Sequence, residues 1–526
     1  MRRIELYDTT LRDGAQGEGI NFSLQDKLAI SRRLDDIGFD YVEGGYPASN
    51  EKDFQFFQRI RQTPLSQIKV CAFGMTRRKG ASADDDAGLQ SLLDSQAATI
   101  TLVGKASAFQ VVEVLQTTLN ENLDMIRQSV ERLVRADREV IFDAEHFYDA
   151  WKQDRGYAMQ TVQAAVEAGA RLVTLCDTNG GSMTDEAAEI TGAAASQLPV
   201  PVGVHFHNDC DLAVANSLAA VEAGAALVLG TINGFGERGG NADLISVAAN
   251  LAVKRQGYEV LKPGGIARLT ELSRFLYESV NMSFRSNQPF VGKSAFAHKG
   301  GMHVSAIVRN TASYEHVDPQ RVGNERRVLV SELSGRSNIV ATATADDPNR
   351  VLAEIVAKEN AGYQFEAADA SYQLLVQRCN GTFRPHFETL HYDVTVDNKV
   401  DGEVRAEAIV KICIAGQDHF EAAEGHGPID ALNAALRKAL NGRFPGLNDL
   451  HLVDYKVRVI NSEAATAAKV RVLIQSEDRD EDWGTVGVDE NIIEASWIAL
   501  LDSFEYKLWK DEKKSPSSAG KGRDRS

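Results

Sequence analysis

Two histidines, His205 and His207, are separated by one residue in the segment VGVHFHND. Residues at this spacing in a β-strand point to the same side of a sheet, so both imidazoles can bind one metal ion. A pair of hydrogen-bonded structural histidines is the alternative. Asp13 in LRDG and Asn241 in ERGGNA could add oxygen ligands. Such a mixed set leaves positions for water or substrate and suits Mg, Mn, Co or Zn rather than a closed structural zinc site.

Other polar side chains stand where predicted strands end. Arg12 directly precedes Asp13 and can hold a carboxylate or a developing oxyanion, although a salt bridge at the rim of the fold is the simpler role. Glu145 is a candidate base or a helix cap, and Asp209 can orient a metal ligand or cap a loop. The glycines of residues 233–241 allow backbone to approach a ligand closely, or they only make a turn.

The elements that must position these residues alternate along the first 255 residues. Short runs of Val, Ile and Leu predict buried parallel strands, and Gly after the last apolar residue of several helical stretches predicts helix ends. The predicted strands are 4–8, 41–45, 69–74, 99–103, 139–143, 172–177, 202–207 and 227–231. With seven intervening helices and an eighth after Asn241, they predict an α/β fold, a (β/α)8 TIM barrel, rather than a doubly wound open sheet. Closure would bring Asp13 and Asn241 to the histidines.

Beyond the barrel the pattern changes. We expect a catalytic barrel over 1–265, helical linker subdomains over 266–390, a C-terminal α+β domain over 391–509 and a disordered tail over 510–526. The C-terminal domain contains an internal repeat of strands, a glycine-containing turn and a helix. Its glycines Gly425, Gly427 and Gly487 could expose backbone N–H groups to a small carboxylate, or could serve only as tight turns.

Composition excludes several classes of protein. A net charge of −17 argues against a general nucleic-acid binder, and no apolar run reaches the roughly 18 residues of a membrane span. The first residues lack the apolar core of a secretory signal. Five scattered cysteines indicate reduced thiols, so we expect a cytoplasmic protein.

Three ordered motifs resemble those of the acyl-CoA-condensing metallolyase family, which includes isopropylmalate, homocitrate and citramalate synthases. The family motif L-R-D-G-x-Q, followed by a lysine, is similar to residues 11–16 and Lys27. The motif H-x-H-[DN]-D is similar to 205–209, and N-G-x-G-E-R-x-G-N-A to 233–242. One departure is Asp211, where the family usually has glycine; an aspartate there is expected to cap a helix.

The resemblance implies a role for each matched residue. The implied metal ligands are Asp13, His205, His207 and Asn241. Arg12 and Thr178 would hold a keto acid, and Glu145 would assist proton transfer. The segments AHKGGMH and SYEHVDP resemble the family's helical subdomain, so His303 and Tyr314 would complete the site, often from the partner subunit.

The implied reaction is a Claisen-type condensation with acetyl-CoA as cosubstrate. The metal would chelate an α-keto acid, a base would remove a proton from the acetyl methyl group, and water would hydrolyse the thioester. The segments VEGGYPASN and FDAEHFYD are most similar to long-form citramalate synthases, which use pyruvate in isoleucine biosynthesis. Isopropylmalate synthase, with 2-oxoisovalerate, is the alternative. We expect the tail of the keto acid near Phe73, Leu102 and Asp143.

Three further functions are less consistent with the residues. One is homocitrate synthase. A hydroxymethylglutaryl-CoA-type lyase would carry a Gly-Gly-Cys-Pro loop and no C-terminal domain. A catalytically silent metal-binding sensor has no need of Arg12, Glu145 and His303 together. The segments EGHGPIDALNAALRKAL and WGTVGVDENIIEASW resemble the family's allosteric domain, which implies a homodimer inhibited by isoleucine, or by leucine if the product is isopropylmalate.

Overall fold

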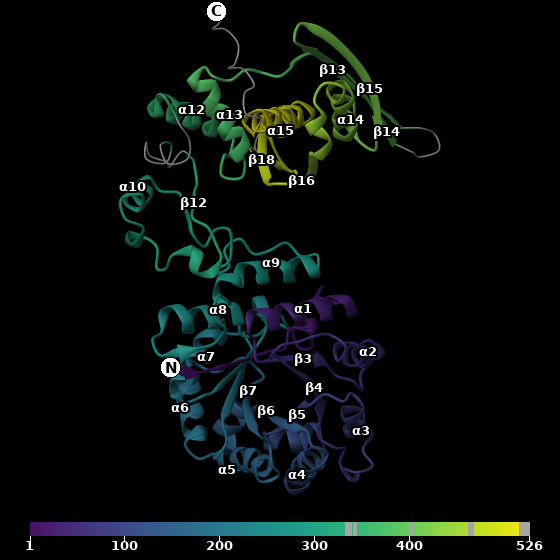
Figure 1. The fold of residues 1–526 in the computed structure, drawn as a ribbon, viewed down its shortest axis with the longest axis vertical. Coiled ribbons are helices and arrows are strands. Elements are labelled where there is room, and N and C mark those ends of the chain that lie inside the picture. The colour runs from purple at the N-terminus through teal and green to yellow at the C-terminus, as the bar shows by residue number, and fades with distance from the viewer. Residues whose placement is uncertain (332–338, 340–344, 399–403, 461–467, 515–526) are drawn as a thin grey trace, which may run out of the picture. The chain divides into compact units, whose positions relative to one another are not determined.

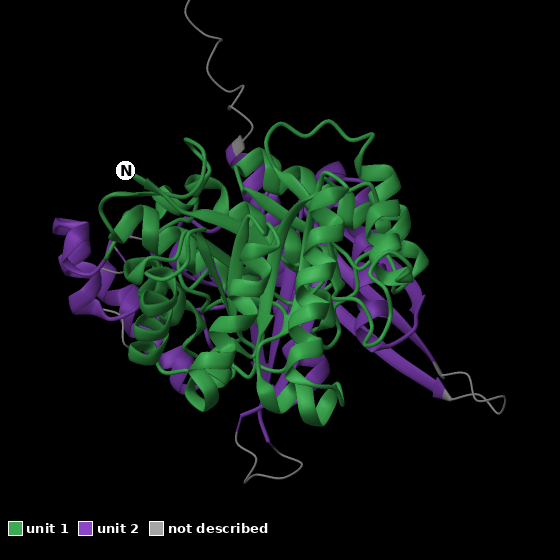
Figure 2. Ribbon diagram, turned by 90° about the horizontal axis from the view of Figure 1, so that it is seen from below, with its two compact units in different colours: residues 1–296, 316–326 green, residues 297–315, 327–526 purple. Residues whose placement is uncertain are grey.

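The computed structural model describes residues 1–331, 339, 345–398, 404–460 and 468–514. The chain forms two compact units (Figure 2): the barrel unit, residues 1–296 with 316–326, and the second unit, residues 297–315 with 327–526. These boundaries differ from the expected ones at 265 and 390, because the expected linker is divided between the two units. In the part of the chain that the structure describes, no helix has the length and apolar character needed to cross a membrane.

A closed barrel of eight parallel strands forms the centre of the barrel unit (Figure 1). Its last strand pairs with its first, which confirms the predicted barrel and excludes the open sheet. All eight predicted strands are present, with small differences at their ends. They are β2 (Glu5–Asp8), β3 (Tyr41–Gly45), β4 (Lys69–Met75), β5 (Thr99–Lys105), β6 (Glu139–Glu145), β7 (Leu172–Asp177), β8 (Val202–Phe206) and β9 (Leu227–Gly230).

The barrel helices surround the strands, and local sequence signals set their ends. The first helix begins with a reciprocal capping box between Ser23 and Asp26 and ends at Gly38, whose φ of 103° is left-handed. A π-helical turn, Gln110–Val114, precedes the fourth helix, which is capped by Thr118. The helices are α1 (Leu24–Ile37), α2 (Glu51–Ile60), α3 (Ala87–Asp94), α4 (Leu119–Arg135), α5 (Phe147–Glu167), α6 (Thr184–Ala195), α7 (Ala213–Ala223) and α8 (Leu244–Ala249).

The expected linker contains separate helices. In the barrel unit, α9 (Leu269–Ser279) buries Leu269, Leu272 and Leu276 in the barrel's hydrophobic core. In the second unit, α13 (Asp369–Asn380) packs on the C-terminal helix, where Ser371 donates a hydrogen bond to Asp502 at 2.7 Å. The described residues of the second unit in this region also form α10 (Gly301–Arg309) and α12 (Pro348–Asn360).

The C-terminal part of the second unit contains the predicted internal repeat. Each half is a three-stranded antiparallel sheet followed by a helix. The last helix continues to Lys514, so residues 510–514 are helical rather than part of a disordered tail, and 515–526 lie outside the described residues. The elements are β13 (Glu388–Asn398), β14 (Val404–Ile414), β15 (Gln417–Gly425), α14 (Pro428–Asn441), β16 (His451–Val459), β17 (Val470–Glu477), β18 (Asp482–Asp489) and α15 (Ile492–Lys514).

Of the three glycines expected in turns, Gly427 lies directly before a helix, whereas Gly425 and Gly487 lie in strands. Gly427 directly precedes α14, as predicted, and Gly425 is the last residue of β15, where a side chain would collide with the backbone nitrogen of Ala431 in α14. Gly487, however, lies inside β18, where a side chain would collide with the backbone oxygen of Ala495 in α15. The backbone N–H of Gly484 donates to Asp369. Gly487 therefore permits close packing of strand on helix and does not form an N–H-exposing turn.

Candidate active site

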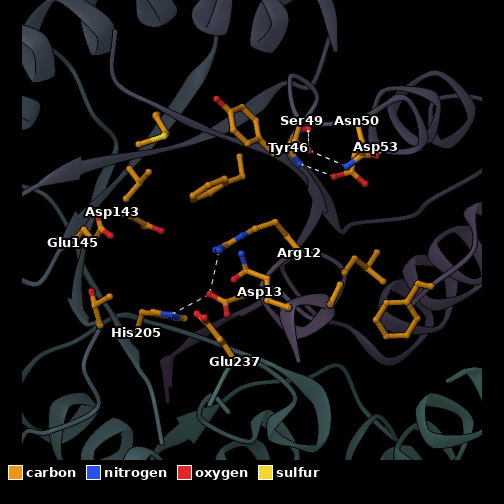
Figure 3. Close-up of a pocket in the computed structure, with 18 of the residues that line it drawn as sticks. Arg12, Asp13, Tyr46, Ser49, Asn50, Asp53, Asp143, Glu145, His205 and Glu237 are labelled. Carbon is orange, nitrogen blue, oxygen red and sulfur yellow. Dashed lines mark hydrogen bonds and ion pairs between the residues drawn. The ribbon is translucent and has the colours of Figure 1, made fainter. Parts of the chain in front are cut away.

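A pocket of about 590 Å³ opens at the carboxyl ends of the barrel strands (Figure 3). This is the end at which TIM-barrel proteins place their active sites. Side chains from the β2–α1 and β3–α2 loops and from the ends of later strands form its wall. The sequence-predicted residues in the wall are Arg12, Asp13, Phe73, Asp143, Glu145, Thr178, His205 and His207.

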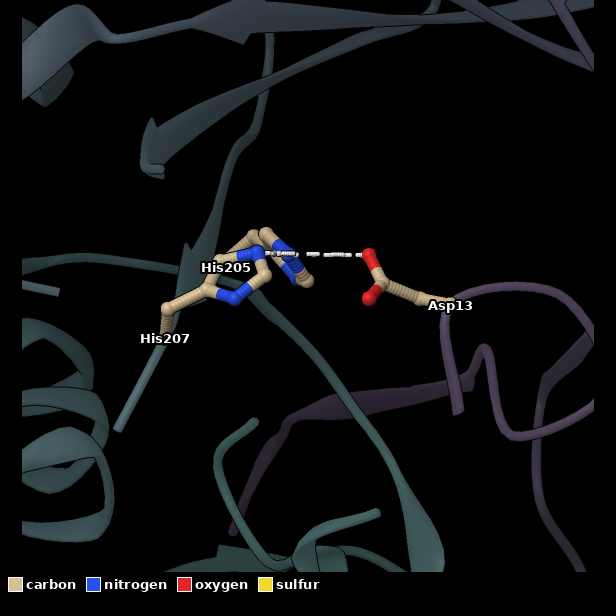
Figure 4. A group of neighbouring side chains, drawn as sticks. All are labelled: Asp13, His205 and His207. Carbon is tan, nitrogen blue, oxygen red and sulfur yellow. Dashed lines mark hydrogen bonds and ion pairs between the residues drawn. The ribbon is translucent and has the colours of Figure 1, made fainter. Parts of the chain in front are cut away.

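Asp13, His205 and His207 form a buried cluster (Figure 4). The two Nε2 atoms lie 3.2 Å apart. Oδ2 of Asp13 is 3.6 Å from Nε2 of His205 and 4.0 Å from Nε2 of His207. Two imidazole nitrogens bound at about 2.0–2.1 Å to one ion, at angles of about 90–109°, would lie about 2.9–3.4 Å apart. The observed separation therefore fits a shared metal ion.

Asn241 completes this group. Its Nδ2 donates to the carbonyl of Phe235 at 3.0 Å and to Oδ1 of Asp13 at 3.2 Å. Its Oδ1 is buried and has no hydrogen-bond partner among the described residues. A buried amide oxygen without a partner is unfavourable unless a donor or a cation meets it. Gly236, with φ of 149°, leaves room for the Asn241 amide, which a side chain there would overlap. The four residues thus fit a divalent cation.

The protonation states of the cluster also suit metal binding. Burial, reinforced by His207, lowers the pKa of His205 to about 3, and burial lowers the pKa of His207. Both rings are therefore neutral near pH 7, as a ligand must be. Burial opposes ionisation of Asp13, but Arg12 and the two histidines outweigh it and lower the pKa of Asp13 to about 2.

Arg12 is held in place by a carboxylate that the sequence analysis missed. Its Nε donates to Oε2 of Glu43 at 2.6 Å, and its Nη1 donates to Asp13 at 3.1 Å. Glu43 is fully buried in β3 and also accepts a hydrogen bond from the Tyr7 hydroxyl at 2.8 Å. The guanidinium lies 4.0 Å from the centre of the Phe73 ring. The signal in the sequence was a glutamate within an apolar strand, which requires a buried partner.

Two carboxylates from β6 differ in their surroundings. Glu145 pairs with Lys105 at 2.5 Å. Asp143 is buried, and its Oδ1 has no hydrogen-bond partner. Burial, with the nearby charge of Glu43, raises the pKa of Asp143 to about 7.

The predicted location of the keto-acid tail needs one correction. Phe73 and Asp143 line the pocket, as expected, but Leu102 does not. Leu102 is fully buried in the hydrophobic core, and Val103 is the β5 residue in the wall. Successive strand residues face opposite sides of the sheet, so an error of one residue moves a side chain from the pocket to the core.

The loops after β7 and β8 place the remaining predicted residues. Thr178 lines the pocket, and its Oγ1 accepts a hydrogen bond from the backbone of His146 at 2.9 Å. Asp209 accepts two hydrogen bonds from Arg238, at 2.8 and 3.0 Å. Asp209 therefore fixes the loop that carries Arg238.

The predicted helix cap at Asp211 is wrong. Helix α7 begins at Ala213, and Oδ1 of Asn208 accepts its N–H at 3.1 Å. Asp211 has φ of +58°, a left-handed conformation that glycine adopts without strain. This conformation gives a physical reason for the glycine in the family motif.

His303 and Tyr314 belong to the second unit, whereas Asp13, His205, His207 and Asn241 belong to the barrel unit. Their rings stack with centres 4.2 Å apart. The adjoining residues His298 and Glu315 pair at 3.2 Å, so two contacts hold the two segments together. The proposed role of His303 and Tyr314 in catalysis stays a prediction.

Together, the closed barrel and its buried cluster define a TIM-barrel protein with a group of side chains that could hold a divalent cation. Residues 3–275 match the HMGL-like family model, residues 290–349 the homocitrate synthase post-HMGL domain-like model, and residues 366–508 the LeuA allosteric (dimerisation) domain. The chain belongs to the HMGL-like family.

Several named proteins match this chain over nearly its whole length. The chain is 47% identical to the (R)-citramalate synthase of Aquifex aeolicus, with 97% of this chain and 98% of that protein covered. It is 48% identical to the (R)-citramalate synthase of Geobacter sulfurreducens, covering 97% and 99%. A probable 2-isopropylmalate synthase of Methanopyrus kandleri is 32% identical, covering 95% and 97%.

Proposed function

We propose that this chain condenses acetyl-CoA with pyruvate to give (R)-citramalate and CoA. The observation that carries the proposal is full-length identity of 41–48% to five (R)-citramalate synthases, against 32% to the probable 2-isopropylmalate synthase. This difference confirms the choice of citramalate synthase made from the sequence and makes the chain an acyltransferase.

A divalent cation, one of Mg, Mn, Co or Zn, fits between Asp13, His205, His207 and Asn241. Bound there, it would make the keto carbonyl of pyruvate more electrophilic. Arg12 keeps Nη2 available after its bonds to Glu43 and Asp13. That group would orient the carboxylate of the keto acid, with Thr178, or stabilise the oxyanion that forms at the carbonyl.

Proton transfer is assigned to the acidic side of the pocket. Glu145, held by Lys105, would assist removal of a proton from the acetyl methyl group. The deprotonated methyl carbon then uses the electron pair of the broken C–H bond to bond to the keto carbon. The keto oxygen takes up a proton. Water hydrolyses the thioester and CoA leaves as the thiol. His303 and Tyr314 would complete the site, from the same or the partner chain.

Regulation is assigned to the C-terminal domain. The match of residues 366–508 to an allosteric dimerisation domain supports a homodimer with feedback control. Isoleucine is the expected inhibitor, since citramalate formation would commit pyruvate to isoleucine biosynthesis. Gly425 and Gly427, before α14, keep their proposed part in binding the inhibitor. A cytoplasmic location stays a prediction from the sequence.

The test is a steady-state assay of CoA release with a thiol reporter. Pyruvate, 2-oxoisovalerate and 2-oxoglutarate are compared at saturating acetyl-CoA and metal, and the product is identified by chiral chromatography. We expect pyruvate to give the highest kcat/KM and (R)-citramalate as product. A higher kcat/KM for 2-oxoisovalerate would assign the chain to isopropylmalate synthesis, and no turnover with any keto acid would refute the condensation.

A further inference from the structure

A buried polar network lies behind the loop 231–243, which carries the candidate metal ligand Asn241. Two hydrogen bonds hold Asn241 to the turn that precedes it. Its backbone N–H donates to the carbonyl of Gly234 at 3.1 Å, and its side-chain Nδ2 donates to the carbonyl of Phe235 at 3.0 Å. The position of residues 234–235 therefore determines where the Asn241 amide points.

Asn233 sets the conformation of that turn and is anchored from outside the loop. It is buried, and its φ of 63° is left-handed, a conformation that is unfavourable for a residue with a side chain unless other contacts hold it. Its Nδ2 donates to the carbonyl of Ser273 in α9 at 3.0 Å. Its Oδ1 accepts from the Ser273 hydroxyl at 2.6 Å and from Nε2 of Gln288 at 3.0 Å. These three hydrogen bonds hold Asn233 in its left-handed conformation.

The buried side chain of Gln288 connects both ends of the loop to α9. Its Nε2 donates to Asn233 near one end and to Oδ2 of Asp243 at the other, at 3.3 Å. Its Oε1 accepts from the hydroxyl of Tyr277 in α9 at 3.1 Å. Because the carbonyl of Ser273 can only accept a hydrogen bond, it fixes the amide of Asn233, and Nε2 of Gln288 must then face the loop.

Further contacts fix both the turn and Gln288. The Tyr277 ring packs edge to face on Phe235, with ring centres 5.3 Å apart, and the carbonyl of Phe235 is the acceptor for the Asn241 amide. The backbone N–H of Gly292 donates to the carbonyl of Gln288 at 3.0 Å, and a side chain at Gly292 would collide with the Gln288 backbone. The amide of Gln288 is therefore held in one position behind the loop.

We propose that Gln288 is a positioning residue that holds Asn241 in the orientation needed to bind a divalent cation. This inference rests on the proposed function, in which Oδ1 of Asn241 meets the cation. Gln288 does not line the pocket, so it acts through Asn233 and Asp243. Without its amide, the turn before Asn241 loses an anchor, and the ligand oxygen has to be ordered when the cation binds. Loss of a group that orients a metal ligand in this way typically weakens metal binding about 10- to 100-fold.

The test measures binding of Co²⁺ to the metal-stripped full chain by titration against a competing chelator. The proteins are the parent, Gln288→Met, Asn241→Ala and the double variant. Methionine keeps the length of the side chain and removes its hydrogen bonds. We expect Gln288→Met to weaken Co²⁺ binding about 10- to 100-fold. In the double variant, Gln288→Met should add no loss to that of Asn241→Ala, because its effect passes through Asn241.

Asn324→Ala is the matched control. Asn324 is buried, and its Nδ2 donates to the carbonyls of Phe290 and Gly292, so it holds the same segment as Gln288. Among the described residues, none of its hydrogen bonds reaches loop 231–243. Asn324→Ala should lower the melting temperature and leave the affinity for Co²⁺ unchanged. An equal loss of affinity in Asn324→Ala and Gln288→Met would reduce Gln288 to a general structural role and overturn the proposal.

Tyr277→Phe is a milder variant, which removes the hydroxyl bonded to Oε1 of Gln288 and should weaken Co²⁺ binding about threefold. The proposal is also overturned if Gln288→Met binds Co²⁺ as tightly as the parent, or if the losses add in the double variant. Should Gln288→Met not fold, unchanged binding in Tyr277→Phe overturns it. A parent that binds no Co²⁺ would instead refute the proposed metal site. A parent that binds Co²⁺ but does not turn over pyruvate would refute the condensation and leave the role of Gln288 in place.

Discussion

Replacing Asp143 by asparagine should stabilise the metal-free barrel at alkaline pH. Asp143 is 4% exposed, and its Oδ1 has no hydrogen-bond partner. Burial and the charge of Glu43 raise its pKa to about 7. A charged carboxylate buried at this position destabilises the folded barrel, and a neutral amide of the same shape does not carry that charge.

The size and sign of the effect follow from proton binding. An aspartate in an unfolded chain has a pKa of about 3.9, so between about pH 4 and pH 7 the native barrel binds more protons at Asp143 than the unfolded chain does. Stability therefore falls as pH rises through this window. A shift of about 3 units at about 1.36 kcal/mol each gives an upper value of about 4 kcal/mol above pH 7. The gain in Asp143→Asn should be near zero at pH 4 and about 2–4 kcal/mol at pH 8.

Hydrogen exchange of peptides from β6 and β7, corrected for intrinsic rates, measures the opening free energy of the barrel. The protein is kept in chelator, because a bound cation would itself lower the pKa of a nearby carboxyl. Glu145→Gln is the control from the same strand, since Glu145 is paired with Lys105 and should show no such gain. The reasoning fails if Asp143→Asn is no more stable than the parent at pH 8, or if its gain is the same at pH 4 and pH 8.

Three further predictions concern the metal, the second unit and regulation. His207→Ala should lose both bound metal and turnover with its barrel intact by circular dichroism; full activity after metal depletion would refute the metal site. His303→Ala should lower kcat by roughly 10²–10⁴-fold with normal metal content. If the site is shared, mixing it with His205→Ala should restore some activity, and an inactive mixture with proven subunit exchange would count against sharing. Isoleucine should reduce the initial rate of the full chain; indifference to isoleucine, leucine and valine alike would leave the C-terminal domain a structural role. A chain that ends near Leu390 is expected to stay active without responding to isoleucine. This truncation removes β18 and α15, on which α13 packs, so the full chain is the better protein for the test.

Much of the fold was determined locally by the sequence. Each barrel strand is a short apolar run between polar turns, and glycine after a helix, as at Gly38, needs no distant partner to end it. The two-residue spacing of His205 and His207 places both rings on one side of a strand whatever surrounds it. Asp13 and Asn241 could be added to the predicted metal ligands because the number of strands predicts a closed barrel. Closure brings both residues to the two histidines. The repeated strand and helix pattern of the C-terminal domain was recognisable for the same reason.

Only the tertiary structure decided which groups have partners. Glu43 is 31 residues from Arg12, and nothing local shows that β3 brings its carboxylate to Nε of that arginine. The pKa of Asp143 is raised by burial and by the nearby charge of Glu43. Both depend on how the strands are arranged in the folded barrel. The sequence predicted a turn at Gly487, whereas in the structure this glycine lies in a strand that packs closely on α15. Side-chain type and spacing are properties of the chain, whereas burial, pairing and close approach arise between segments that are distant in sequence and meet only on folding.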